Sequence, residues 1–388
     1  MLRRTLVAAA VAVVAVFAAT PAYADNVRVQ QWHLNYLKIA QAQQIAQGAG
    51  VTVAVIDSGV ADHQDLSDNV LDGTDVVPGG AGNGRSDSEG HGTGMAGLIA
   101  AHGHGAGGKD GALGIAPKAK ILPITITTAK YQGQDQPMAD AIRYAMAHGA
   151  KIINISQDTG DLQTLRAVND AQAAGVLIFA AAGNTDQGDT AVSSPARYPW
   201  VVAVAGVDKN GNHAPTSVAG AEVELAAPGV DIVTTGLKGI WRKGTGTSDA
   251  TAIVSGVAAL VWSKFPNLSA AEVLHRIEAT AVDKGPAGRD PQFGYGVVDP
   301  VAALTADVPS SASPSAQASS PLPTLASPPA DALPDSGGSG DSKLPLLLAV
   351  AGGAVVLIII LVIVAVAMSR SRRRPPPPSA GPPWSPGR

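Results

Sequence analysis

The sequence GTGTSDATAIVSG, residues 244–256, governs how the rest of the chain is interpreted. Its glycines allow a sharp turn and a close backbone approach, and a nearly continuous apolar run follows from Ala250 to Val261. This pattern predicts a tight turn that leads into a buried helix, with Ser248 at its mouth. Ser248 is then either an N-cap or a nucleophile, whose substrate oxyanion the helix N-terminus would stabilise. On this stretch alone the cap is the commoner role.

Three further polar residues fit the second role. A nucleophilic serine needs a base to take its proton and a carboxylate to orient that base. Asp57 directly follows an apolar run, His91 lies between glycines at the entry to a helix, and Asn184 ends a strand that runs into a turn. Each alone is more often a turn or loop residue. The sequence thus offers Ser248 a base, a carboxylate to orient it and, at Asn184, an amide that could face a developing oxyanion.

Apolar, β-branched runs alternate with helical patterns through the middle of the chain. The expected strands cover residues 51–56, 121–126, 152–155, 176–180 and 201–205. The expected helices cover residues 95–101, 138–148, 162–174 and, from a capping box at Ser269 and Glu272, 269–280. Such alternation predicts an α/β fold with a central, mostly parallel sheet and helices on both faces.

The N-terminus carries the pattern of a secretory signal peptide. Arg3 and Arg4 precede an apolar run at residues 6–19 and the small-residue site Ala-Tyr-Ala at 22–24. We therefore expect residues 1–24 to be removed, which leaves Asp25 as the first residue. An uncleaved anchor helix is the alternative, but the run is short for a membrane span.

A second apolar run lies near the C-terminus. Residues 344–368 contain no charged side chain and are long enough to form a transmembrane helix, with a buried core helix as the alternative. The basic, proline-rich tail at 369–388 follows, and the positive-inside rule places it in the cytoplasm. The two signals together predict a single-pass plasma-membrane protein whose folded part is extracellular.

Three segments lie between these signals. Residues 25–50 are polar and glutamine-rich, and we expect them to form an arm that packs on a domain. Residues 51–305 form the expected domain. Residues 306–343 are mostly Ser, Pro and Ala, which cannot bury enough apolar surface to fold, so we expect a disordered spacer.

The charge and cysteine content exclude some partners and some sources of stability. Residues 25–343 carry 20 of the 27 Lys and Arg against all 31 Asp and Glu, a formal charge of about −11. An acidic ectodomain argues against binding to nucleic acid or to an anionic lipid surface. The chain has no cysteine, so its stability must come from burial of a core rather than from disulfides.

Four segments resemble the subtilisin-like serine protease family: Asp57-Ser-Gly, His91-Gly-Thr, Ala-Ala-Gly-Asn184 and Gly-Thr-Ser248, in this order. The resemblance covers residues 51–304 and implies the family's three-layer α/β fold and serine endopeptidase activity. It implies that Asp57 orients and stabilises the imidazole, that His91 acts as general base and then acid, and that Ser248 attacks the peptide carbonyl. Asn184 and the backbone N–H of Ser248 would form the oxyanion hole.

The same resemblance implies how a peptide binds. Residues 153–156 match the family's strand that pairs with extended substrate, so we expect binding by β-augmentation. The substrate-binding residues carried over in this way are Asn154, Ser156, Gln157, Asp158, Ala181 and Gly183.

The order of segments resembles that of the mycosins, the membrane proteases of type VII secretion systems. The expected partners are therefore protein or peptide substrates and the membrane components of such a system. The arm at 25–50 is too short for the folded inhibitory propeptide of many subtilisins, so we expect no control by a pro-domain.

Several positions depart from the family pattern. Gly94 stands where histidine is usual, Gln157 and Asp158 replace Leu-Gly, and Ala252 replaces a proline. Asp249 replaces an apolar or small residue directly after Ser248. A carboxylate beside a forming oxyanion raises the barrier unless it points away or is protonated, so we expect Asp249 to slow the enzyme. The alternative is that Asp249 only complements the helix dipole. We expect Asp158 to favour basic substrate side chains.

No metal or cofactor is expected. Calcium sites occur in many members of the family, but no acidic loop here compels one. His102 and His104 could bind a metal, but no third ligand is suitably spaced, so an exposed flexible loop is favoured.

Two other functions remain open at this point. One is a non-catalytic or barely catalytic scaffold that stabilises a secretion complex, favoured by Asp249 and Gln157. The other is an esterase, against which the peptide-pairing strand counts.

Overall fold

The computed structural model describes residues 27–77, 80, 82–127 and 135–309. The predicted signal peptide, the apolar run at 344–368, the basic tail and nearly all of the spacer lie outside these residues. Within the part of the chain that is described, no helix is both long and apolar enough to cross a bilayer.

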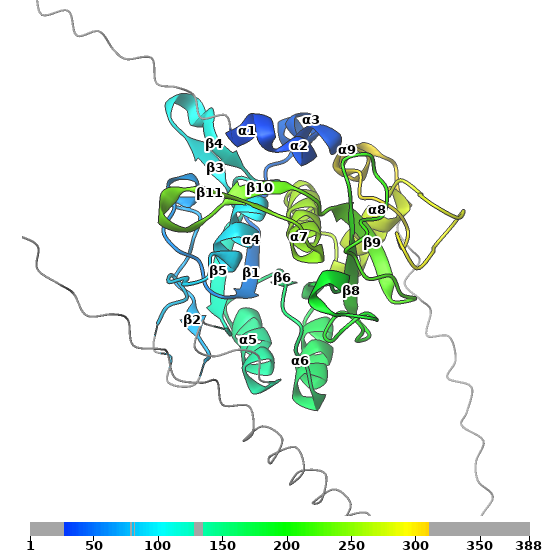
Figure 1. The fold of residues 1–388 in the computed structure, drawn as a ribbon, viewed down its shortest axis with the longest axis horizontal. Helices are drawn as coiled ribbons and strands as arrows, with labels where there is room; N and C mark the ends of the chain where they lie inside the picture. The colour runs from blue at the N-terminus through cyan, green and yellow to red at the C-terminus, as the bar shows by residue number, and fades with distance from the viewer. Residues whose placement is uncertain (1–26, 78–79, 81, 128–134, 310–388) are drawn as a thin grey trace, which may run out of the picture. The chain divides into compact units, whose positions relative to one another are not determined.

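Seven parallel strands form the central sheet in the order β2-β5-β1-β6-β7-β8-β9 (Figure 1). They are β1 (Thr52–Asp57), β2 (Thr74–Asp75), β5 (Lys120–Thr125), β6 (Ile152–Ile155), β7 (Leu177–Ala181), β8 (Val201–Val207) and β9 (Val223–Pro228). The α/β fold with a parallel sheet is therefore confirmed. The sequence reading missed β2, which has only two residues, and β9, whose apolar run is interrupted by Glu224.

Helices cover both faces of this sheet. They are α1 (Val27–Gln30), α2 (Trp32–Tyr36), α3 (Ile39–Ile45), α4 (His91–Ala100), α5 (Asp135–Ala147), α6 (Leu162–Ala173), α7 (Thr247–Lys264), α8 (Ala270–Ala279) and α9 (Pro300–Thr305). Side chains alternate across β1, so Val53 and Val55 join the core beneath α4 and α7. Ala54 and Ile56 join the core beneath α5 and α6. Figure 1 shows α4 beside α7, and α5 beside α6.

The segment 244–256 forms a turn and then a buried helix, as predicted. Gly246 occupies the N-cap position of α7, and nearly all of the helix from Thr247 to Trp262 is buried. Ser248 is the second residue of the helix and its side chain makes no capping bond, so the N-cap interpretation is wrong.

Helix α4 begins four residues earlier than predicted. His91 is its first residue, whereas the apolar pattern suggested a start at Met95. The first turn contains Gly92 and Gly94, which give no periodic apolar signal. By contrast, the capping box of Ser269 and Glu272 forms as predicted at the start of α8.

The N-terminal segment packs on the domain as three short helices. Gln31 Nε2 donates to the carbonyls of Leu113 and Val233, at 3.0 and 3.1 Å, and Trp32 Nε1 donates to that of Val230 at 3.0 Å. Leu34, Leu37, Ile39 and Ala42 are buried in the same core as α7. The segment is thus an integral part of the folded unit.

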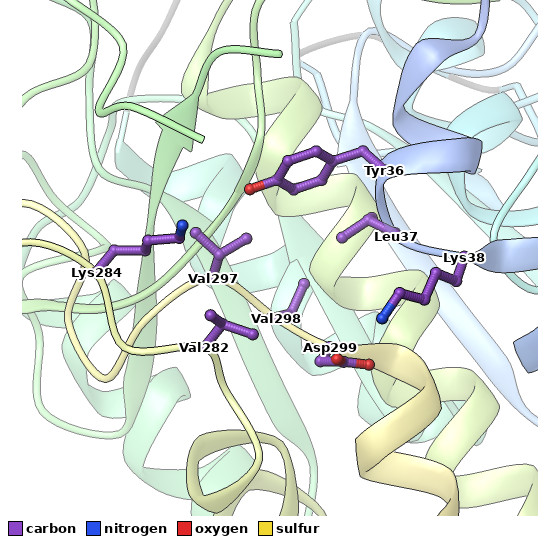
Figure 2. A pocket seen from close by; sticks show the side chains of 8 residues that line it. All are labelled: Tyr36, Leu37, Lys38, Val282, Lys284, Val297, Val298 and Asp299. Carbon is purple, nitrogen blue, oxygen red and sulfur yellow. The ribbon is translucent and has the colours of Figure 1, made fainter. Parts of the chain in front are cut away.

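Figure 2 shows the contact between this segment and the last part of the domain. Tyr36, Leu37 and Lys38 face Val282, Lys284, Val297, Val298 and Asp299 around a pocket of about 160 Å³. Lys38 adopts a left-handed backbone conformation, with φ of 52°, where α2 gives way to α3. The contact joins the two sequence ends of the folded unit.

Two small antiparallel sheets lie outside the central one. The first pairs β10 (Ile232–Thr235) with β11 (Trp241–Gly244), and the second pairs β3 (His102–His104) with β4 (Asp110–Leu113). His102 and His104 are therefore strand residues, and the prediction of a flexible exposed loop is wrong. His104 Nδ1 donates to the buried Asp65 at 2.6 Å, which fixes the strand.

Candidate active site

Asp57 and His91 meet at the carboxyl end of β1. Asp57 is the last residue of β1 and is fully buried, and His91 is the first residue of α4. The Nδ1–H of His91 donates to the Asp57 carboxylate, with Nδ1 lying 2.8 Å from Oδ1 and 2.9 Å from Oδ2. This bond leaves Nε2 as the ring nitrogen that can accept a proton.

The start of α4 is held against β1 by a close backbone approach. A Cβ on Gly92 would lie 2.2 Å from the carbonyl oxygen of Gly59 and 3.1 Å from Cβ of Asp57. Only glycine allows this approach, which brings the first residue of the helix over the end of the strand.

Asp87 fixes the same turn, and the sequence reading missed it. Its Oδ1 accepts from the backbone N–H of Glu89 and Gly90 at 2.9 and 2.8 Å. Its Oδ2 accepts from the backbone N–H and the hydroxyl of Thr93 at 3.0 and 2.6 Å. Asp87 thereby serves as a cap for α4 and positions His91. The sequence signal that could have identified Asp87 is a carboxylate a few residues before the apolar run of a helix.

Asn184 is tied to the first turn of α7. The side-chain Oδ1 of Asn184 accepts from the backbone N–H of Thr247 at 2.9 Å. The backbone N–H of Asn184 donates to Asp189 Oδ2 at 2.7 Å. The side-chain oxygen is thus occupied, so the Asn184 amide is left with its NH₂ group as the donor to offer. The turn that carries this donor is fixed on the residue directly before Ser248.

Ser248 follows Thr247 in the first turn of α7, next to the residue that anchors Asn184. Its side chain is half-buried, and in the described part of the chain its hydroxyl has no partner, His91 included. Hydrogen bonds between a serine and a neighbouring base are often long or absent before substrate binds.

Asp249 is buried and paired with Arg242, a residue that the sequence reading missed. Asp249 is only 2 % exposed, and its Oδ1 accepts from Nη2 of Arg242 at 2.9 Å. Arg242 lies in β11, and its guanidinium packs over Gly94, where a Cβ would be 2.3 Å from Nε. The two departures from the family pattern, at 94 and 249, are therefore linked by Arg242.

These charges act on one another. Burial disfavours the charged form of His91, but the charge of Asp57 and its hydrogen bond outweigh this effect and raise the pKa of His91. Arg242 opposes that rise and Asp249 adds to it. Burial also raises the pKa of Asp249, an effect that the positive charges of Arg242 and His91 offset only in part.

The expected substrate strand needs a correction. Residues Ile153 to Ile155 of β6 pair with β1 on one side and β7 on the other, so this stretch has no free edge for a peptide. Asn154 is fully buried and its side chain bonds Ser255 and Ser156, at 3.0 and 3.2 Å. The backbone becomes available for pairing only after Ser156, where β6 has ended.

Gln157 and Asp158 lie in this irregular segment, and Asp158 is exposed. Oδ1 of Asp158 accepts from the Ser193 hydroxyl at 2.7 Å. Partial burial, together with the nearby carboxylate of Asp189, raises the pKa of Asp158, although the Ser193 bond opposes the shift. Asp189 also accepts from the backbone N–H of Asn184, so it links the Asp158 carboxylate to the turn that carries Asn184.

The remaining predicted residues lie where β7 ends. Ala181 is the last residue of β7, and Gly183 adopts a φ of 114° just before Asn184. Such a positive φ favours glycine, and it turns the chain toward α7.

Over the residues described, no group of three or more His, Cys, Asp or Glu side chains is arranged to hold a metal ion.

Comparison with known proteins gives a consistent result. Residues 48–296 match the model of the Subtilase family. Mycosin-1 of Mycolicibacterium smegmatis is 34% identical over 351 residues, covering 74% of this chain and 75% of that protein. Alkaline elastase YaB of a Bacillus species is 37% identical over 276 residues, covering 70% of this chain and 69% of that protein.

Solved structures agree with these relatives. The structure of MycP1 with the N-terminal propeptide removed matches with a TM-score of 0.67 and 35% identity, and covers 72% of this chain and 98% of that one. The structure of MycP3 protease from the type VII (ESX-3) secretion system matches with a TM-score of 0.61 and 34% identity, over 71% and 88% of the two chains.

Proposed function

This chain belongs to the subtilase family and is a serine endopeptidase, and from that premise we propose that Asp57, His91 and Ser248 are its catalytic residues. Ser248 Oγ attacks the peptide carbonyl while His91 Nε2 takes its proton, and His91 then returns that proton to the leaving amine. Water hydrolyses the resulting acyl-enzyme by the same route in reverse. Asp57 holds the imidazole in the required tautomer and stabilises its charged form.

The oxyanion hole consists of the Asn184 amide and the backbone N–H of Ser248. The observation that carries the assignment of the three catalytic residues is the bond from Nδ1–H of His91 to both carboxylate oxygens of the buried Asp57. This bond orients the imidazole, and Asp57 raises its pKa. The anchoring of Asn184 on Thr247 supports the donor role, since a fixed donor stabilises an oxyanion without reorganising.

Labelling with a fluorophosphonate tests the nucleophile. The protein should become labelled at Ser248, and Ser248→Ala should lose both the label and the cleavage of peptide substrates. Ser263→Ala, at a serine near the far end of α7, is the matched control and should keep both. Labelling that survives in Ser248→Ala would refute the assignment.

Substrates bind along the irregular segment that starts at Ser156, with Gln157 and Asp158 beside the scissile bond and Ala181 and Gly183 opposite. The two carboxylates at Asp158 and Asp189 favour a basic side chain near the cleavage site, because opposite charges attract at close range.

We further infer a role at the outer face of a membrane in type VII secretion. The support is the similarity to Mycosin-1 and to the MycP3 protease, together with the signal peptide predicted at 1–24 and the anchor predicted at 344–368. Added protease should digest the domain in intact cells while the tail at 369–388 stays protected. Protection of the domain would rule out this orientation.

The rival function as an inactive scaffold loses its main support. It rested on Asp249 and Gln157, and the charge of Asp249 is paired with Arg242 at 2.9 Å.

A further inference from the structure

A pocket of about 440 Å³ opens at the end of the sheet opposite the catalytic residues. It is lined where β7, β8 and β9 begin, by Leu177, Val202 and Glu224 among others. Asp57 and Asn184 lie at or beyond the carboxyl ends of strands parallel to these. The pocket is therefore separate from the active site.

Helix α8 supplies the facing wall. Ala270, Leu274 and Glu278 recur at four-residue spacing along one side of this helix, and all three line the pocket. Glu224, from the second position of β9, meets Glu278 there, and the two carboxyl groups share a hydrogen bond. Two acids from different elements thus meet inside a pocket whose other walls are largely apolar.

Two aromatic side chains line the same pocket. Trp200 is 61 % exposed and Tyr295 is 41 % exposed, which is unusual for residues of this size in a folded domain. Faces of tryptophan and tyrosine attract cations, and a carboxylate nearby strengthens that attraction. Arg289 lies over the Tyr295 ring, with its guanidinium carbon 5.7 Å from the ring centre, but it does not line the pocket.

From this geometry we propose that the pocket binds a lysine or arginine side chain of a partner protein, with its N–H groups on Glu224 and Glu278 and its stem against Trp200 and Tyr295. Charge complementarity selects this occupant, because two adjacent carboxylates attract a cation, and Arg289, which acts on both from outside the pocket lining, does not offset the rise in their pKa. The volume of the pocket is ample for one long side chain.

Binding should release a proton. Burial and the neighbouring Glu224 raise the pKa of Glu278 to about 8, and burial raises that of Glu224 as well. The positive charge of Arg289 opposes both shifts without cancelling them, so near neutral pH the free pair retains a proton. An arriving cation keeps its own protons and displaces the shared one into solvent. Affinity should therefore rise as the pH increases from 6 to 8.5, by up to about tenfold per unit.

Calorimetry with synthetic peptides tests the site. The titrant is the acetylated, amidated peptide Ala-Leu-Lys-Leu-Ala, and the protein is the full chain carrying Ser248→Ala, so that nothing is cleaved. Matched peptides carry norleucine or trimethyl-lysine in place of lysine. We expect the lysine peptide to bind at least tenfold more tightly than either at pH 8.5. We also expect its apparent enthalpy to differ between phosphate and Tris buffers because a proton is released.

Variants locate the binding. Glu278→Gln should weaken it at least tenfold and abolish its pH dependence, whereas Glu222→Gln, at an exposed carboxylate that does not line the pocket, should leave this binding unchanged. The proposal fails if trimethyl-lysine binds as well as lysine, or if Glu278→Gln has no effect. It also fails if the peptide binds only to a chain shortened to residue 309, since the occupant would then be this chain's own basic end. Loss of peptide cleavage in Ser248→Ala concerns the catalytic proposal alone.

Discussion

Gly94 and Arg242 fit together so closely that any side chain at position 94 would collide with the guanidinium. A Cβ there would lie 2.3 Å from Nε and 3.0 Å from Nη2 of Arg242. Arg242 reaches this position from β11, and the adjoining strand β10 is bound to the first turn of α4 by Thr234 and Thr235, whose hydroxyls donate to the carbonyls of Gly94 and Thr93. The hairpin is therefore joined to the first turn of α4 by these two hydrogen bonds and by the packing of Arg242 on Gly94.

Arg242→Met should lower kcat/KM by about 10- to 100-fold, because a buried Asp249 carboxylate beside the forming oxyanion then lacks its cation. Stability should fall by about 1–3 kcal/mol, less than for a fully buried pair because Arg242 is partly exposed. Steady-state kinetics and urea unfolding measure the two effects.

The double variant Arg242→Met/Asp249→Asn is the control, since it removes both charges. It should recover most of the lost activity, while Arg242→Lys keeps a cation and should lose less than Arg242→Met. An Arg242→Met enzyme as active as the wild type would show that Arg242 does not need to neutralise Asp249.

The pH profile of kcat/KM should show an acid limb above pH 6.5, because Asp57 raises the pKa of His91 and only the neutral imidazole can take the Ser248 proton. Arg242→Met should shift this limb to higher pH, since Arg242 lowers that pKa. Asp57→Asn should shift it to lower pH and reduce kcat by about 10,000-fold. A limb that does not respond to Asp57→Asn would show that another group titrates.

The main residues of the candidate site could be read from the sequence because each carries a local signal. Asp57 ends an apolar run, His91 and Asn184 lie next to glycines, and Ser248 lies just before a long apolar run. The sheet was predictable for the same reason, since its central strands are apolar on both faces. Strand β9 was not, because Glu224 sits within it.

The partners of these residues could not be read in the same way. Arg242, Asp87 and Asp189 act through contacts that depend on how separate elements pack, and a single charged residue in a loop or short strand gives no periodic signal. Whether a peptide can pair with residues 153–156 depends on the order of the strands, which a local pattern does not show. Strand β6 lies between β1 and β7 and has no free edge. Local pattern thus points to the groups proposed to react, and packing determines which charges surround them.

Asp158→Asn should reduce the preference for arginine over leucine at the cleavage site by about tenfold, since about 1.4 kcal/mol of charge attraction is removed. Competition between two peptides that differ only at this position measures the ratio. Asp189→Asn should act in the same direction but also lower kcat, because Asp189 supports the backbone of Asn184. An unchanged ratio in Asp158→Asn would exclude this carboxylate from specificity.

His33 should make the folded domain sensitive to acid. It is fully buried, neither ring nitrogen has a hydrogen-bond partner among the described residues, and burial lowers its pKa from 6.5 to about 3. Because only the unfolded chain binds the proton between these values, stability is complete above pH 6.5 and is lost as the pH falls. Between pH 6.5 and 5, the free energy of unfolding should fall by about 2 kcal/mol less in His33→Leu than in the wild type. The exposed His148→Asn should not change this fall, and urea unfolding measures both. Equal slopes in wild type and His33→Leu would mean that the ring is protonated in the folded protein.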